Sequence, residues 1–196
     1  HRDLHSFPTR RSSDLIAILG VGPTGIMHVM LAKLYGFAQI FCLDLNDFRL
    51  DYAKKFETMT IRSDNPNVTE IIKSETGNQG VDVVIVSTGS MKALQDAFSF
   101  VRKGGTVVMF GVPSKGTKID LDMSKIYSKE INIVNSYAAS DFDTKDALEK
   151  ISSKKINVKQ LITHKYHLDE SQKAFEHARS GRSEEHTSEL QSRTNL

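Results

Sequence analysis

The run from Ile16 to Gly25 constrains the fold more than any other part of the chain. It begins with the apolar stretch IAILG, which has the length and composition of a buried strand. Gly20, Gly22 and Gly25 then follow the spacing G-x-G-x-x-G, and residues 24–35 carry apolar side chains at helical spacing. The first glycine permits a tight turn, the second lets a phosphate approach the backbone, and the third lets helix and strand pack closely. The run therefore predicts a strand–turn–helix unit with an anion site at the start of the helix.

Apolar and amphipathic runs alternate along the rest of the chain. We predict strands over 16–20, 39–44, 58–61, 81–89, 106–112, 118–122 and 131–137, with an extended segment over 161–168. We predict helices over 24–35, 47–56, 68–77, 90–102, 123–128, 142–153 and 170–178, and a turn at Gly104 and Gly105. This alternation indicates a doubly wound α/β fold, a three-layer Rossmann arrangement with a parallel sheet.

An acidic residue at the end of the second predicted strand extends the glycine motif. Asp44 lies nineteen positions after Gly25, where dinucleotide sites place the carboxylate that binds the adenosine ribose. A carboxylate there accepts hydrogen bonds from both ribose hydroxyls and repels a 2′-phosphate, which favours NAD over NADP. Arg49, five positions farther on, either lies against this ribose or is a solvated helix residue, and the sequence favours neither.

Composition limits the function classes. A length of 196 residues suits one domain, or one domain with appendages. The net charge of +2, without a run of Lys or Arg, argues against nucleic acid or an anionic membrane as the main partner. Cys42 is the single cysteine, so an intramolecular disulfide and a cysteine-rich zinc site are excluded, and a reducing, cytoplasmic location is expected. No apolar run approaches the ~20 residues of a membrane helix.

The two ends of the chain differ in texture from the part between them. Residues 1–15 and 182–196 are rich in Ser, Arg, Glu and Thr and have no helical or strand period, which is typical of disordered ends. The runs FPTRRSSDL and RSEEHTSELQS also resemble translations of the adapter oligonucleotides used in short-read sequencing libraries. We therefore expect both ends to be non-native tails around an internal fragment, residues 16–181, of a longer protein. Genomic codons for FPTRRSSDL would contradict this expectation.

Several separated runs, in order, resemble the medium-chain, zinc-dependent alcohol dehydrogenase superfamily. They are LGVGPTGIMHVMLAKLYG, DLNDFRLDYAKKF, VDVVIVSTGS, VRKGGTVVMFGVP and LITHKYHLDESQKAFEHARSG, and the branch they are most similar to contains the sorbitol and threonine dehydrogenases. The resemblance implies an NAD-binding Rossmann domain followed by a helical segment over residues 16–181. It implies a parent enzyme that transfers hydride from a primary or secondary alcohol, or a polyol, to NAD.

The resemblance also implies which residues contact the cofactor. The diphosphate loop would consist of Gly20, Gly22, Pro23, Thr24 and Gly25. Asp44 would bind the adenosine ribose with Arg49 nearby. The central part and the nicotinamide half of NAD would contact Thr88, Gly89, Gly111, Val112 and Ser136. In this family the strand INIVNS often pairs across a two-fold axis, so the resemblance implies a homo-oligomeric parent, a dimer or a tetramer.

The superfamily's other domain has no counterpart in this sequence. Members carry a GroES-like catalytic domain that holds the catalytic zinc through a Cys, a His and an acidic residue, and often a second zinc on four cysteines. Zinc acts there as a Lewis acid on the alcohol oxygen. The resemblance therefore assigns no catalytic or metal-binding residue to this chain. We expect the parent to be a dehydrogenase and this polypeptide alone to be inactive.

Three other functions remain as alternatives. The first is a non-catalytic NAD-binding or regulatory module. The second is a zinc-free, quinone-reductase type of the same superfamily, although such proteins commonly use NADPH, which Asp44 disfavours. The third is a methyltransferase, which shares a glycine loop and an acidic strand end; the third glycine of the motif, Gly25, argues against it.

Five further residues are of types that often bind metals or take part in catalysis, but their sequence context favours a structural role. His164 and His167 lie three apart in an extended segment, so their side chains point to opposite faces and are not expected to share a metal. His28 is expected on the surface of the first helix, with a place in the cofactor cleft as the alternative. Cys42 is expected to be a buried small apolar residue, and Asp47 a first-turn acid favoured by the helix dipole.

Overall fold

The computed structural model describes residues 13–179 and 185–188. The chain forms two compact units, His1–Ile156 and Asn157–Leu196, which are described separately. Most of the two predicted tails, residues 1–15 and 182–196, lies outside the described residues. Within the described part, no helix combines the length and the apolar character that a membrane crossing requires.

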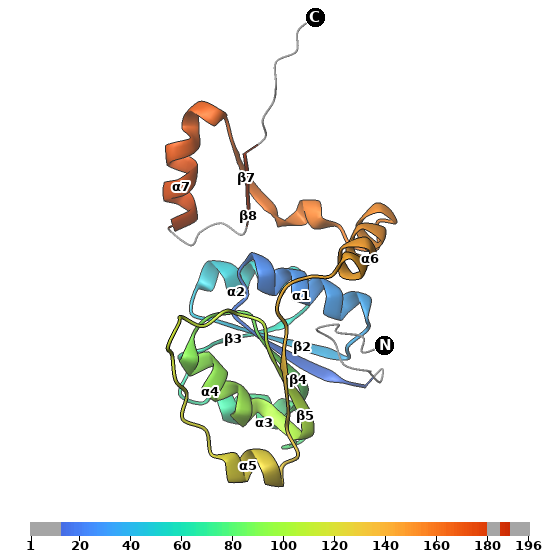
Figure 1. Ribbon diagram of the computed structural model, residues 1–196, viewed down its shortest axis with the longest axis vertical. Coiled ribbons are helices and arrows are strands. Elements are labelled where there is room, and N and C mark those ends of the chain that lie inside the picture. The colour runs from blue at the N-terminus through green and yellow to red at the C-terminus, as the bar shows by residue number, and fades with distance from the viewer. Residues whose placement is uncertain (1–12, 180–184, 189–196) are drawn as a thin grey trace, which may run out of the picture. The chain divides into compact units, whose positions relative to one another are not determined.

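The first unit contains a six-stranded parallel sheet in the order β3-β2-β1-β4-β5-β6. Its strands are β1 (Leu15–Leu19), β2 (Gln39–Asp44), β3 (Met59–Arg62), β4 (Val81–Val86), β5 (Val101–Met109) and β6 (Asn132–Asn135). Its helices are α1 (Pro23–Leu34), α2 (Asp47–Lys54), α3 (Val68–Glu75), α4 (Met91–Phe100), α5 (Met123–Ser128) and α6 (Asp141–Ser152). Figure 1 shows α1 and α2 on one face of the sheet and α3 and α4 on the other. The predicted doubly wound fold is confirmed, and its strand order reverses between β1 and β4.

The central strands are apolar throughout because helices cover both faces of the sheet. Ile16, Ala17 and Ile18 of β1 and Val84 and Ile85 of β4 have no exposed surface. Burial of each isoleucine or valine side chain among them stabilises the fold by about 1.5–3 kcal/mol relative to exposure. Continuous burial of this kind produces the unbroken hydrophobic runs of parallel strands, in place of the polar alternation of a half-exposed sheet.

The end of α4 and the start of β5 differ from the prediction. The predicted helix over 90–102 is present but ends at Phe100, and the predicted turn at Gly104 and Gly105 is wrong, because β5 begins at Val101 and continues through both glycines. The pairing of β4 with β5 shifts register here, and Gly104 has φ +70°. Arg102 also binds Asp82 of β4 through its Nε. The glycines therefore permit an irregularity inside the strand rather than ending it.

The predicted strand over residues 118–122 is also wrong, since this segment contains no strand. Most of its residues are exposed, so burial does not favour a place in the sheet. Asp122 instead begins α5, where its carboxylate accepts hydrogen bonds from the backbone N–H groups of Ser124 and Lys125. An N-cap of this kind satisfies amides that have no partner inside the helix.

The second unit is small. It contains η1 (Val158–Leu161), β7 (Ile162–Tyr166), η2 (Leu168–Glu170), α7 (Ser171–Arg179) and β8 (Glu185–Ser188). The predicted extended segment and the predicted last helix are present as β7 and α7. β8 pairs in parallel with β7, although it lies in the segment that was expected to have no regular structure.

The close approach of α1 to the turn after β1 gives a test of the packing. A Cβ on Gly25 would lie 2.0 Å from the backbone oxygen of Gly20, which cannot move without disturbing the turn. We expect Gly25→Ala to lower the free energy of unfolding by about 1–3 kcal/mol, as overpacked sites do. Gly22→Ser is the matched control. A Cβ there first meets the end of the Arg49 side chain, at 3.4 Å, rather than a backbone atom; serine is also a favoured N-cap residue. Equal losses in urea unfolding would contradict the role given to Gly25.

Candidate functional site

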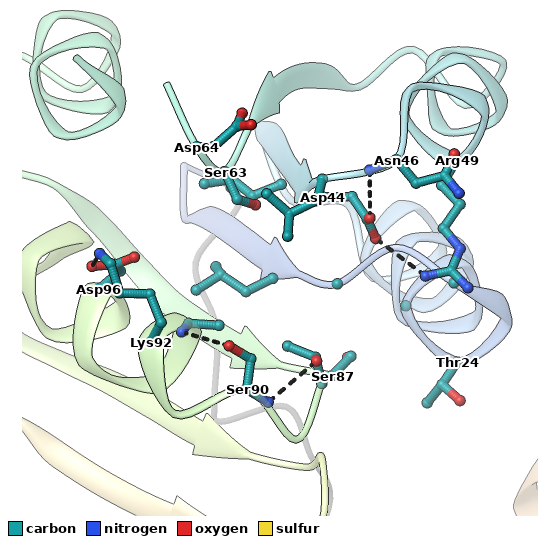
Figure 2. A pocket seen from close by; sticks show the side chains of 18 of the residues that line it. Thr24, Asp44, Asn46, Arg49, Ser63, Asp64, Ser87, Ser90, Lys92 and Asp96 are labelled. Carbon is teal, nitrogen blue, oxygen red and sulfur yellow. Dashed lines mark hydrogen bonds and ion pairs between the residues drawn. The ribbon is translucent and has the colours of Figure 1, made fainter. Parts of the chain in front are cut away.

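A cleft of about 860 Å³ lies in the first unit at the carboxyl edge of the sheet. It is bounded by the glycine loop after β1 and by the ends of β2, β3 and β4 (Figure 2). The predicted site residues that line this cleft are Gly20, Gly22, Pro23, Thr24, Gly25, Asp44, Arg49 and Thr88. Ligands of open α/β sheets bind at this edge, where the strand order reverses.

A backbone hydrogen bond to β2 and close packing against the residue that follows β4 hold the glycine loop in place. Gly20 has φ +85°, and its N–H donates a 2.7 Å hydrogen bond to the backbone oxygen of Leu43 in β2. A Cβ on Gly20 would lie 3.0 Å from that of Thr88, beyond the end of β4. α1 then begins at Pro23, with neither a capping side chain nor an acid in its first turn. The amides and the positive dipole end of α1 are therefore available to an anion in the cleft.

Asp44 lies at the centre of the cleft wall and is 8% exposed. Its Oδ2 accepts a hydrogen bond from the N–H of Val21, and its Oδ1 accepts one from the N–H of Asn46, both at 2.9 Å. Figure 2 shows the carboxylate between Asn46 and Arg49. Each carboxylate oxygen has more than one lone pair, so Asp44 can accept further hydrogen bonds from a ligand.

Arg49 extends from α2 to the glycine loop. Its Nη1 lies 3.8 Å from Oδ2 of Asp44, and its Cζ lies 3.4 Å from the position of a Cβ on Gly22. The side chain is 31% exposed, so the guanidinium is not a fully solvated helix group. Among the described residues, its buried Nε has no hydrogen-bond partner. A buried donor without a partner is unfavourable, and an acceptor on a ligand would satisfy it.

The residues predicted for the nicotinamide half gather at the same edge but do not line this cleft, apart from Thr88. A Cβ on Gly111 would lie 2.3 Å from the backbone of Thr88, and one on Gly89 would lie 2.9 Å from the backbone oxygen of Val112. Ser136 follows β6 and donates its N–H to the end of β5 at 3.0 Å. The structure therefore brings the ends of β4 and β5 together, with Ser136 one strand farther along.

The cleft includes polar residues that the sequence interpretation missed. They are Asn46, Ser63, Asp64, Ser87, Ser90, Lys92 and Asp96. Ser63 and Asp64 directly follow β3, so the rule that ligands bind at the carboxyl ends of parallel strands was a usable signal for them. Lys92 and Asp96 form an ion pair of 2.5 Å one turn apart on α4, and nothing in the sequence distinguishes it from an ordinary surface pair.

Three charged residues, Asp47, Arg62 and Asp64, form what we term the Arg62 cluster. Nη1 of Arg62 lies 2.7 Å from Oδ1 of Asp47. Its Nε and Nη2 lie 2.9 and 2.8 Å from the two carboxylate oxygens of Asp64. These bonds raise the pKa of Arg62 above its usual value and lower the pKa of Asp64. Asp47 is the first-turn acid that was predicted, and it also binds Arg62.

His28 is buried, with 4% of its surface exposed. Its Nδ1 lies 3.0 Å from Oγ of Ser87, and its ring contacts Phe110 edge to face at 4.6 Å between centroids. The predicted place on the helix surface is therefore wrong, because this face of α1 packs on the ends of β4 and β5. The alternative is not supported either, since His28 does not line the cleft. Burial lowers the pKa of His28 to about 4, and a hydrogen bond to the Thr24 backbone offsets part of the effect.

The surroundings of Cys42, His164 and His167 do not indicate a catalytic or metal-binding role. Cys42 is fully buried in β2, as predicted, and burial raises the pKa of its thiol to about 12. In the second unit, the ring of His164 lies 4.1 Å from that of His177, whereas His167 is exposed after the end of β7. Within the described residues, no group of three or more His, Cys, Asp or Glu side chains is placed to hold a metal ion.

A family model and curated protein sequences both match this chain. A family model described as "Zinc-binding dehydrogenase" matches residues 23–153. Sorbitol dehydrogenase of Bacillus subtilis is 37% identical over 164 residues, which cover 83% of this chain and 46% of that protein. The chain spans about half the length of the curated relatives it matches.

Solved structures share the fold. Alcohol dehydrogenase TADH from Thermus sp. ATN1 superposes with a TM-score of 0.84 at 23% identity, covering 90% of this chain and 51% of that one. A structure from E. coli CFT073, described as short chain alcohol dehydrogenase (rspB) complexed with the cofactor NADH, has a TM-score of 0.75 at 21% identity, covering 86% of this chain and 49% of that one. At these identities the likeness concerns the fold alone.

The buried imidazole of His28 gives a pH-dependent prediction. The unfolded chain binds a proton at this residue near pH 6.5, whereas the folded chain resists protonation until about pH 4. The contribution of the neutral His28 side chain to the free energy of unfolding is therefore complete above pH 6.5. It is lost as the pH falls toward 4, by up to about 3 kcal/mol. We expect His28→Gln to remove this component, so that urea unfolding of the variant depends less on pH between 6.5 and 4. His167→Gln, a control at an exposed residue, should show the same pH dependence as the unsubstituted chain. If the free energy of unfolding depends on pH equally in His28→Gln and in the unsubstituted chain, His28 is not the source of this pH dependence.

Proposed function

The chain belongs to the zinc-binding dehydrogenase family, and from this premise we propose that its first unit is the NAD-binding domain of a zinc-dependent alcohol or polyol dehydrogenase. The observation that carries the proposal is the buried Asp44 carboxylate, which lies beside an uncapped helix start and a glycine loop in one cleft. These are a ribose acceptor and a diphosphate cradle at the spacing that a dinucleotide requires. A solved structure that shares the fold is described as complexed with NADH, which supports the proposal.

The residues present fit the adenosine half of NAD. The diphosphate would lie against the amides at the start of α1, where Gly22 presents no side chain. The two ribose hydroxyls would donate to the free lone pairs of Asp44. The unpaired Nε of Arg49 would then find an acceptor on the cofactor. One orphaned donor and one partly used carboxylate are thus matched by groups that a single ligand carries.

The nicotinamide half belongs, in this proposal, at the ends of β4, β5 and β6. Thr88, Gly89, Gly111, Val112 and Ser136 would contact it, mainly through backbone groups. Support comes from the close approach of Thr88 to Gly111 and of Gly89 to Val112. Since Gly89 and Gly111 pack directly on neighbouring backbone, side chains there would displace the strand ends that receive the ring.

The chemistry of the parent enzyme requires groups that the described residues do not supply. We propose that zinc is bound in a separate catalytic domain, because the relatives are about twice as long as the matched region and the described residues form no metal-binding group. Zinc bound there would polarise the alcohol oxygen as a Lewis acid. The residues of this chain would bind NAD and fix the position of its ring.

The proposal extends to the organisation of the parent. Residues 16–181 are proposed to be the native fragment, with 1–15 and 182–196 as non-native tails. The substrate would be a small alcohol or polyol, by analogy with the sorbitol dehydrogenase relative, and the location cytoplasmic. A homo-oligomer would form through β6, which is exposed and lies at the edge of the sheet.

Cofactor binding tests the proposal directly. We expect the 196-residue chain to bind NADH in calorimetric titration, at least about tenfold more tightly than NADPH, because Asp44 repels a 2′-phosphate. Asp44→Ser should reduce this preference, whereas Asp51→Ser, an exposed acid on α2, should leave it unchanged. Gly22→Ser should weaken NADH binding while the chain stays folded. Binding of S-adenosylmethionine in place of NADH would overturn the proposal.

Turnover gives a second test. With NAD and sorbitol, threonine or simple alcohols, the chain alone should form no NADH above background. The reason is that binding and orienting the cofactor does not supply the group that activates the alcohol. Turnover by the purified chain at the rate of an intact dehydrogenase would show that the catalytic groups do not lie outside it.

A further inference from the structure

A second arginine stands next to Asp44 but does not reach the cleft. Arg62 ends β3 and is the register partner of Asp44, which ends β2. Neighbouring strands lie about 4.8 Å apart, and register partners on parallel strands project from the same face of the sheet. Arg62 therefore leaves the sheet beside Asp44 and on the same side. It is nevertheless absent from the residues that line the cleft, whereas Ser63 and Asp64 are among them.

The Arg62 cluster explains this difference. Asp64 binds Nε and Nη2 of Arg62 together, and Asp47, at the start of α2, binds Nη1. Three of the five guanidinium N–H groups are thus directed at carboxylates. The geometry with Asp64 is bidentate, the arrangement that fixes an arginine most firmly. The guanidinium is held by the cluster, and its charge is offset by two acids.

Stability alone does not account for this arrangement. The side chains of the cluster have exposed fractions between 42% and 74%. Exposed ion pairs of this kind contribute little to the free energy of unfolding, because solvent screens them. The cluster places two carboxylates and one guanidinium beside Asp44, so we expect its main effect on the charge of ligands that bind there rather than on the free energy of unfolding.

The group that would sense this charge is a phosphate on the ribose. Sites that accept the 2′-phosphate of NADP place an arginine near the 2′ position. Such a phosphate carries close to two negative charges at neutral pH and prefers a guanidinium with free donors. In this chain three of the five N–H groups of the neighbouring arginine bind the carboxylates of Asp47 and Asp64, and Asp64 adds a negative charge to the cleft wall.

We propose that Asp47 and Asp64 sequester Arg62 and thereby form a second determinant of cofactor choice, which excludes a 2′-phosphorylated dinucleotide in addition to the repulsion by Asp44. The inference rests on the proposed function, in which this cleft binds the adenosine half of NAD. It predicts that removing the Asp44 carboxylate alone raises the affinity for NADPH only in part. Releasing Arg62 as well should raise the affinity for NADPH beyond the level that Asp44→Ser reaches with Arg49 alone beside the ribose.

The test compares Asp44→Ser with the triple variant Asp44→Ser/Asp47→Asn/Asp64→Asn. Calorimetric titration with NADH, NADPH and 2′,5′-ADP measures binding, and circular dichroism verifies the fold. We expect the triple variant to bind NADPH and 2′,5′-ADP about tenfold more tightly than Asp44→Ser does, through a released arginine. Adding Arg62→Gln to the triple variant should abolish this gain. Adding Arg62→Gln to Asp44→Ser alone should change NADPH binding less than twofold, because there Arg62 is still sequestered.

A matched control separates local release from a general change of charge. Asp44→Ser/Asp51→Asn/Glu57→Gln removes the same charge from two exposed ion pairs of the first unit, with Lys54 and Lys33, outside the cluster. We expect this control to bind NADPH like Asp44→Ser. The inference is overturned if the control gains as much as the triple variant, if the triple variant gains nothing, or if the gain survives Arg62→Gln.

The same titrations distinguish this failure from that of the proposed function. If the unsubstituted 196-residue chain, titrated alongside the variants, does not bind NADH, the proposed function fails and the inference with it. If NADH binds to the parent chain and to the variants but their NADPH affinities do not separate, only the role of the Arg62 cluster is overturned.

Discussion

The hydrogen bonds that the Asp44 carboxylate accepts from Val21 and Asn46 connect the parts of the site. They join the loop after β1, the end of β2 and the turn into α2 through one buried group. A buried carboxylate is strongly unfavourable unless such donors surround it. The loop that would hold a diphosphate is therefore fixed by the residue that would hold the ribose, so neither half of the adenosine site can shift alone.

The sequence predicted the features that depend on local signals. The glycine spacing, a buried strand before it and an acid at the end of the next strand were sufficient to predict where the loop and Asp44 lie. The burial of His28 was not predictable, because it depends on Phe110 and Ser87, which are distant in the sequence. The Arg62 cluster was missed because Arg62 and Asp64, two residues apart, look like ordinary surface charges, and Asp47 joins them from fifteen residues away.

The glycine pair at the start of β5 shows how a strong local signal is overridden. Two adjacent glycines normally indicate a turn, yet β5 continues through Gly104 and Gly105. The pairing of Val101 with Val81 and of Thr106 with Val83 holds the chain against β4 on either side of the irregularity, and Arg102 binds Asp82 between them. Tertiary contacts thus decided between a turn and a bulge, whose glycine requirements are the same.

The place of Arg49 bears on how a ligand would be received. Its guanidinium already rests between Gly22 and Asp44, with Nε turned inward and unpaired. An arginine side chain loses up to about 2 kcal/mol of rotamer freedom when it is ordered. Because the folded chain already holds the Arg49 guanidinium beside Gly22 and Asp44, less of that loss is left for ligand binding, and the site is preorganised at this residue.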